Sequence, residues 1–132
     1  MAPGHNADGI FTIIQPLGIW IAGDYLTNIE FPYIYHSSYE YENTLKKVDH
    51  ILSNHRIKIL IPGHGDHTTS IREIEKRKIE NQGYIQQLRK SLKNGLSYPI
   101  NSLWKRYIFQ KGMKSFHDGN IQLIEKELKS NL

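Results

Sequence analysis

The chain has 132 residues, with 17 lysines and arginines against 13 aspartates and glutamates, and 39% of its residues are hydrophobic. This length and composition are typical of one folded domain and argue against a disordered chain. The absence of cysteine excludes disulfides, thiolate metal sites and a cysteine nucleophile, so any metal ligands must be histidines and carboxylates. The sequence starts without a signal-peptide pattern and no apolar run approaches the ~20 residues that span a bilayer, so we expect a cytoplasmic protein.

Two short runs of β-branched and aromatic residues, 10–14 and 19–22, predict an antiparallel hairpin. The turn between them is Gln15-Pro16-Leu17-Gly18, a Pro/Gly turn. A third strand is predicted over residues 57–61, where Pro62-Gly63 ends it. Because the first two runs are almost continuously apolar, we expect both faces of the sheet to be covered.

Two helices are predicted around the third strand. Apolar residues at three- and four-residue steps indicate an amphipathic helix over residues 38–54, capped by Ser37 or Ser38. A longer helix follows Ser70 and ends near Asn94-Gly95, where glycine suits the left-handed position after a helix.

Two shorter helices complete the prediction. Pro99 opens one of them, which extends to Ile108, and Asp118 or Asn120 caps the last. The chain therefore changes character near residue 70, from β-β-α-β to helical. We expect a mixed fold (α+β or α/β), in which residues 71–132 form a helical extension of about three helices packed on residues 1–70 as a single folding unit.

The charge is unevenly distributed. Residues 1–71 carry a balance of −3, residues 72–114 carry 11 basic and three acidic residues, a balance of +8, and the rest carry −1. A basic segment of this kind is attracted to nucleic acid, or it is simply a solvated helix surface. We favour the solvated surface, because aromatic residues are sparse there and no recognition motif accompanies them.

Three candidate metal ligands lie beside the three predicted strands. His5 precedes the first, Asp24 follows the second and His64 follows the third. Strand ends are rigid and adjacent in space, and the neighbouring glycines let the backbone approach an ion closely. Taken alone, each of these residues is more often structural, but two imidazoles with one carboxylate form a ligand set that suits zinc, iron or manganese.

The motifs around these residues resemble the C-terminal half of the metallo-β-lactamase superfamily. They are Ala2-Pro3-Gly4-His5, Gly23-Asp24 and Ile61-Pro62-Gly63-His64-Gly65, in the family's order and strand context. The resemblance implies that His5 binds one metal, His64 binds the second and Asp24 bridges both. It also implies two zinc ions in the complete site, and residues 1–70 as half of an αββα sandwich, with residues 71–132 as a variable C-terminal extension.

The family's signature His-x-His-x-Asp-His loop belongs to the N-terminal half, upstream of the position that matches His5. The segment from Pro62 to His67 fits this pattern except at its first position. We prefer the C-terminal assignment, because His5 and Asp24 would otherwise have no explanation. Asp66 and His67 are then expected near the ligands or at the surface rather than as ligands, with metal binding by them as the alternative.

The function implied by the resemblance is metal-dependent hydrolysis of a small-molecule ester, lactone, thioester, amide or phosphoester by hydroxide. Asp24 would be the catalytic residue that holds both metals and orients the hydroxide. Because this sequence supplies only three of the usual ligands, we expect a truncated half with partial or no metal occupancy and little activity of its own.

An aromatic loop follows Asp24, and it either shapes a substrate pocket or packs into the core. In the pocket interpretation, Tyr33, Tyr35 or His36 would polarise a substrate carbonyl. Three other histidines are expected at solvated helix or loop positions: His50, His55 and His117.

A lone half of this fold leaves one apolar sheet face to be covered. The candidates are the missing N-terminal half, a second copy of the chain, or the chain's own C-terminal helices; we expect a homodimer. Two other functions remain as alternatives, a non-catalytic dimeric interaction module and a nucleic-acid-binding module.

Overall fold

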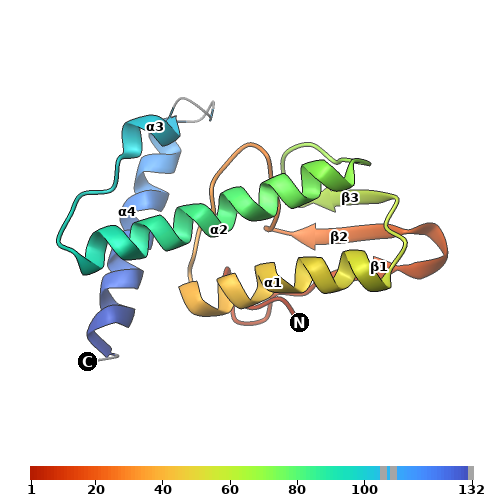
Figure 1. The fold of residues 1–132 in the computed structure, drawn as a ribbon, viewed down its shortest axis with the longest axis horizontal. Helices are drawn as coiled ribbons and strands as arrows, with labels where there is room; N and C mark the ends of the chain where they lie inside the picture. The colour runs from red at the N-terminus through yellow and green to blue at the C-terminus, as the bar shows by residue number, and fades with distance from the viewer. Residues whose placement is uncertain (105–106, 108–109, 131–132) are drawn as a thin grey trace.

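The computed structural model describes residues 1–104, 107 and 110–130. Its elements in chain order are β1 (Thr12–Ile14), the 3-10 turn η1 (Gln15–Leu17), β2 (Ile19–Gly23), α1 (Ser38–Asn54), β3 (Ile59–Pro62), α2 (Ile71–Lys93), α3 (Ile100–Trp104) and α4 (Gln110–Ser130). The expected mixed α and β character is confirmed: a three-stranded sheet is combined with helices (Figure 1).

The sheet has the order β1-β2-β3. β1 pairs antiparallel with β2, as the hairpin prediction required, and β3 lies parallel to β2 with Leu60 opposite Trp20. Both predicted outer strands are shorter than expected. β1 begins at Thr12, the first residue paired with β2, and β3 begins at Ile59, whose backbone N–H donates to the Gly18 carbonyl.

The two longest predicted helices begin as their capping residues indicate. The Ser37 side chain accepts a hydrogen bond from the Glu40 N–H at the start of α1, and Ser70 accepts one from the Glu73 N–H at the start of α2. α2 ends at Lys93, and Gly95 follows with a φ of 64°, the left-handed conformation that glycine adopts at little cost. These two predictions are confirmed.

The prediction for the last helix is wrong at its start. α4 begins at Gln110, so Asp118 and Asn120 lie inside it rather than capping it. Asp118 pairs with Lys114 one turn earlier, at 2.8 Å, and the Asn120 side chain is occupied by bonds to the loop before α1. Neither side chain is therefore available to a helix start. The preceding helix, α3, starts at Ile100 as expected, whereas the predicted continuation to Ile108 lies outside the described residues.

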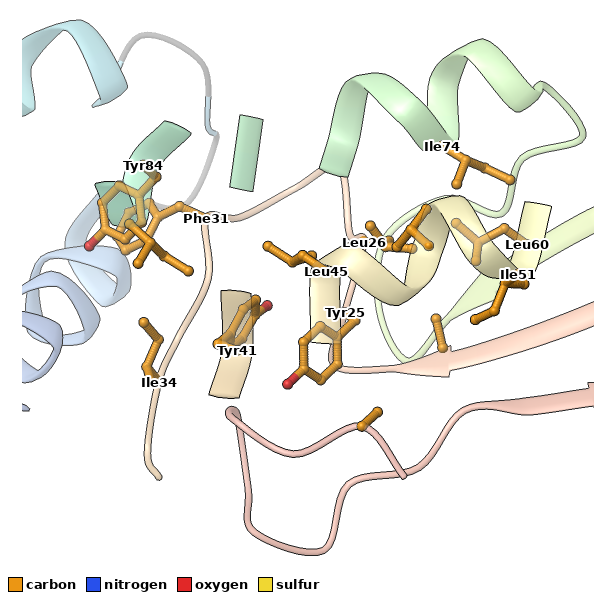
Figure 2. Close-up of a cluster of buried hydrophobic side chains, with 14 of the residues drawn as sticks. Tyr25, Leu26, Phe31, Ile34, Tyr41, Leu45, Ile51, Leu60, Ile74 and Tyr84 are labelled. Carbon is orange, nitrogen blue, oxygen red and sulfur yellow. The ribbon is translucent and has the colours of Figure 1, made fainter. Parts of the chain in front are cut away.

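The core lies between the sheet and the pair α1 and α2, which run along the same face of it (Figure 1). Leu45 from α1, Leu60 from β3 and Ile74 from α2 are at most 1% exposed and gather in one cluster (Figure 2). Burying a side chain of this size contributes about 1.5–3 kcal/mol each. Toward α4 the cluster continues through Phe31 and Tyr84, whose rings stack at 4.7 Å.

The opposite face of the sheet is open within this chain, so the expectation that both faces are covered would require another polypeptide. Side chains alternate across a strand, so the positions next to the buried ones point away from the helices. Ile14, Ile21 and Ile61 are 38%, 41% and 37% exposed. α4 packs against α2, so within the described residues the chain's own C-terminal helices do not cover this face.

The basic segment after residue 71 is partly paired with α1. The Arg89 guanidinium contacts Glu42, and Lys78 bonds Asp49 at 2.6 and 2.7 Å. A share of the +8 balance is thus matched by acidic side chains of the neighbouring helix. No helix among the described residues combines the length and apolar character needed to cross a membrane.

Candidate metal centre

The three strand-end residues His5, Asp24 and His64 lie together. The Nε2 atom of His5 is 3.1 Å from Oδ2 of Asp24, and Nε2 of His64 is 2.7 Å from Oδ1 of the same carboxylate. Each oxygen of Asp24 therefore faces one imidazole. The structure brings the three predicted residues into contact, with the carboxylate in the middle.

The end of β2 and the end of β3 approach through their glycines. The Gly63 N–H donates to the Gly23 carbonyl at 2.6 Å. A Cβ on Gly63 would lie 3.1 Å from that carbonyl oxygen and 3.3 Å from Oδ1 of Asp24, closer than nearly all real Cβ contacts. Glycine at position 63 therefore allows the ends of β2 and β3 to approach closely beside Asp24.

His5 is held by a network around the N-terminal loop. Its backbone N–H donates to the Tyr25 hydroxyl at 3.1 Å, and that hydroxyl donates to the Pro3 carbonyl at 2.7 Å. Burial raises the pKa of Tyr25 to about 12, so the hydroxyl stays protonated and remains a donor. The Nδ1 atom of His5 lies 2.6 Å from the Tyr33 carbonyl oxygen, which fixes the orientation of the ring.

Glu30 belongs to the cluster, although no pattern in the sequence selects it. Its Oε1 lies 2.9 Å from Nδ1 of His64, on the side of the ring away from Asp24. Burial raises the pKa of Glu30, while the nearby His64 opposes that shift. The residue sits in an irregular loop with no periodicity or motif, so only the folded chain shows its proximity to His64.

Both imidazoles have an oxygen acceptor at each nitrogen. The Tyr33 carbonyl can only accept, so Nδ1 of His5 must carry a proton; in a neutral ring, Nε2 then turns a lone pair toward Asp24. His64 stands between two carboxylates in the same way. The arrangement is satisfied by further protons, on the rings or on Glu30 beside His64, or by cations shared between the Nε2 atoms and Asp24.

Hydrogen bonds link the loop that carries Asp24 to the loop that carries His64. The Nη1 atom of the buried Arg77, on α2, donates to the Leu26 carbonyl at 3.0 Å and to the Asp66 carbonyl at 2.8 Å. Asn28 and Asp66 also exchange two hydrogen bonds of 2.8 Å. Asp66 thus supports the loop, as expected for a residue near the ligands.

The donor set fits a cation in part. Ligand atoms about 2.0–2.1 Å from one zinc ion lie roughly 3.3 Å apart in tetrahedral geometry, which is close to the His5–Asp24 contact of 3.1 Å but clearly longer than the His64–Asp24 contact of 2.7 Å. Each imidazole also offers Nε2 while Nδ1 is held by an oxygen, the usual arrangement of metal-bound histidine. Among the described residues, however, no group of three or more histidines and carboxylates converges on a single ion position.

The other predicted site residues are divided between packing and surface. Tyr33 stacks on Phe116 of α4, with ring centroids 4.2 Å apart, so its ring packs against a helix rather than standing free in a pocket. Tyr35 is 59% exposed beside the His5 ring, and His36 pairs with Glu40 at 2.7 Å.

His67 is exposed and forms no side-chain hydrogen bond or ion pair in the described part of the chain. His117, expected to be solvated, is only 4% exposed, because the α2–α4 contact encloses it. That expectation is wrong. His50 is exposed as expected, whereas His55 is partly buried and bonds Gln15.

Comparison with known proteins adds no relative: no protein-family model matches the chain, and a search of curated proteins finds no significant match. The evidence for its function is therefore the geometry described above.

Proposed function

We propose that this chain supplies His5, Asp24 and His64 as three ligands of a two-metal hydrolase site of the metallo-β-lactamase type. The observation that carries the proposal is the position of Asp24, with one carboxylate oxygen on each imidazole Nε2. A carboxylate that lies between the two imidazoles supports the bridging role that the resemblance of the sequence motifs implies for Asp24. Zinc suits these ligands best, and iron or manganese also binds imidazole and carboxylate.

The residues of the chain would each have a distinct part in such a site. Asp24 would hold both ions and accept a hydrogen bond from the attacking water. His5 and His64 would be kept in the ligating tautomer by Tyr33 and Glu30, which bind the Nδ1 side of each ring. When bound, the metals would lower the pKa of a water to near neutrality and stabilise negative charge on the substrate oxygen.

The proposal requires ligands from outside these three residues. One histidine and one carboxylate oxygen per ion fall short of the three or more protein ligands typical of a catalytic metal site. The missing ligands would come from a further polypeptide segment that carries the His-x-His-x-Asp-His loop. We therefore expect the 132-residue chain to bind zinc weakly and to hydrolyse esters poorly.

Zinc titration calorimetry tests the ligand assignment. We expect weak binding by the chain, lost in Asp24→Asn and in His64→Ala but retained in His50→Gln, which alters an exposed histidine on α1. Melting curves of each variant would exclude unfolding as the cause. Binding that survives Asp24→Asn would refute the assignment, and tight uptake of two ions with hydrolysis of p-nitrophenyl acetate would refute the half-site.

The open sheet face favours a second candidate function, a dimeric interaction module. We infer that this face, which carries Ile14, Ile21 and Ile61, pairs with the same face of a second copy. The face has no charged residue at its strand positions, so two copies would meet without burying charge.

Light scattering tests the dimer. We expect a dimer at micromolar concentration and a monomer for the Ile21→Lys, Ile61→Lys double variant, because each interface would then bury four ammonium groups. Ile79→Lys, at a residue 63% exposed on α2, is the matched control and should stay dimeric. A monodisperse monomer of the unaltered chain would rule out self-association and leave another polypeptide as the occupant of this face.

A further inference from the structure

A second candidate site lies at the other end of the molecule, between α2, residues 96–100 and α4. It is a pocket of about 310 Å³, at the lower end of the range of small-molecule sites. Leu88, Leu92 and Ile121 form apolar walls, and His117 contributes a polar group. None of its lining residues belongs to the cluster around Asp24.

A chain of hydrogen bonds fixes the proton on His117. The Asn120 amide donates to the Pro32 carbonyl at 2.7 Å and to the Tyr84 hydroxyl at 3.0 Å. The Tyr84 hydroxyl therefore accepts from Asn120 and has its own proton left for Nδ1 of His117, 2.8 Å away. Only the tautomer with the proton on Nε2 gives every hydrogen in this chain an acceptor.

The Nε2–H of His117 is then a donor without an acceptor among the described residues. The residue is 96% buried and lines the pocket, and its one side-chain hydrogen bond among the described residues is made by Nδ1. Burial lowers the pKa of His117, and the ring is neutral at pH 7. A neutral donor among apolar walls is the usual form of a small-molecule site, in which one polar group fixes the orientation of the ligand.

The charges at the pocket are already matched. Lys114 and Asp118 line it and pair with each other at 2.8 Å. A charged ligand would have to compete with this ion pair and would be desolvated against the apolar walls at a cost. We propose that the pocket binds a small uncharged molecule whose carbonyl oxygen accepts from Nε2–H of His117 and whose short hydrocarbon part packs on Leu88, Leu92 and Ile121.

Hexanamide is a suitable probe, with hexylammonium as a partner of similar length that has no acceptor. In ¹⁵N-resolved NMR of the full chain, we expect His117 to show the Nε2–H tautomer, and hexanamide at millimolar concentration to shift its Nε2 resonance. Hexylammonium should leave this resonance unchanged. A His117 ring with its proton on Nδ1, or no response to hexanamide, would overturn the proposal.

Two variants separate binding in the pocket from binding elsewhere. Ile121→Trp fills the pocket and should abolish hexanamide binding, whereas His117→Phe keeps the apolar volume and should weaken it about fivefold through loss of one hydrogen bond. Binding followed by amide shifts of α2 and α4 gives a readout that survives the loss of the histidine. Unchanged affinity in both variants, each checked for folding by its melting curve, would place the ligand elsewhere and refute the assignment.

Discussion

The two faces of the sheet carry similar apolar residues, but one face is buried and the other is partly exposed. Trp20, Ala22 and Leu60 lie on the buried face and are fully buried. The alternate positions Ile21 and Ile61, equally apolar, are more than a third exposed. Apolar strand residues thus indicate that a face is suited to burial, but they do not say whether the covering layer comes from the same chain.

The largest expected effect on stability comes from comparing one substitution on each face of the sheet. Leu60→Ala should lower the free energy of unfolding by about 3 kcal/mol, because it leaves a cavity beneath α1 and α2. In the monomeric chain, Ile61→Ala, the next residue along β3, should cost less than about 1 kcal/mol, because more than a third of its side chain is exposed there; in the proposed dimer its cost should be larger. Urea unfolding at two protein concentrations measures both. Equal losses that grow with protein concentration would mean that the Ile61 face is buried in solution by a second copy.

The next largest effect on stability is expected at Arg77, which links the loops that carry Asp24 and His64. Arg77→Met keeps an unbranched apolar stem but leaves the Leu26 and Asp66 carbonyls without their donor. We expect a loss of about 2 kcal/mol in unfolding free energy. Lys76→Met is the control, because that side chain is 61% exposed and only pairs with Glu73 at 3.7 Å. If both substitutions have the same small effect, the buried guanidinium does not fasten these loops.

A smaller effect is expected at Glu30. If Asp24 and His64 bind zinc, Glu30→Gln should weaken zinc binding about tenfold, because Nδ1 of His64 loses its carboxylate partner. The stability of the metal-free protein should change little. Glu40→Gln removes a comparable carboxylate from His36, outside the cluster, and should leave zinc affinity as it is. Equal affinity in the two variants would remove Glu30 from the site.

These effects also mark how far the sequence could predict the site. The proximity of His5, Asp24 and His64 could be predicted because the ends of neighbouring strands must lie close together, whatever the details of packing. The contacts of Glu30 and Arg77 could not be predicted, because Glu30 lies in an irregular loop and Arg77 resembles any basic residue on a helix. Their contacts depend on how α2 and the loop after Asp24 pack, which no local pattern encodes.

The helix starts show the same difference between local interactions, which the sequence predicts, and tertiary contacts, which it does not. Ser37 and Ser70 marked helix starts because capping is a local interaction between a side chain and the next turn. Asn120 has the same residue type as a capping residue, but its amide is used 86 and 88 residues away in sequence, by Ile34 and Pro32. A polar residue that is recruited by tertiary structure is indistinguishable in the sequence from one that caps a helix.

The smallest predicted effect comes from His117, where the helical end of the molecule encloses a titratable group. Burial lowers its pKa in the folded chain, against a smaller raising effect of Asp118. Below its ordinary value of about 6.5, the unfolded chain therefore binds more protons at this residue than the folded one, and acidification favours unfolding. The protein therefore loses stability through His117 progressively as the pH falls from about 6.5 to the lower pKa of this residue in the folded state.

The comparison with His117→Gln isolates this contribution, because the glutamine carbonyl still offers Tyr84 an acceptor but does not titrate. Between pH 8 and pH 5, the unaltered chain should lose more unfolding free energy than the variant, while the titrations of the other histidines cancel in the difference. An NMR titration should place the midpoint of His117 below the ordinary histidine value of about 6.5. A midpoint at or above that value would mean that the α2–α4 contact opens in solution and exposes the His117 ring.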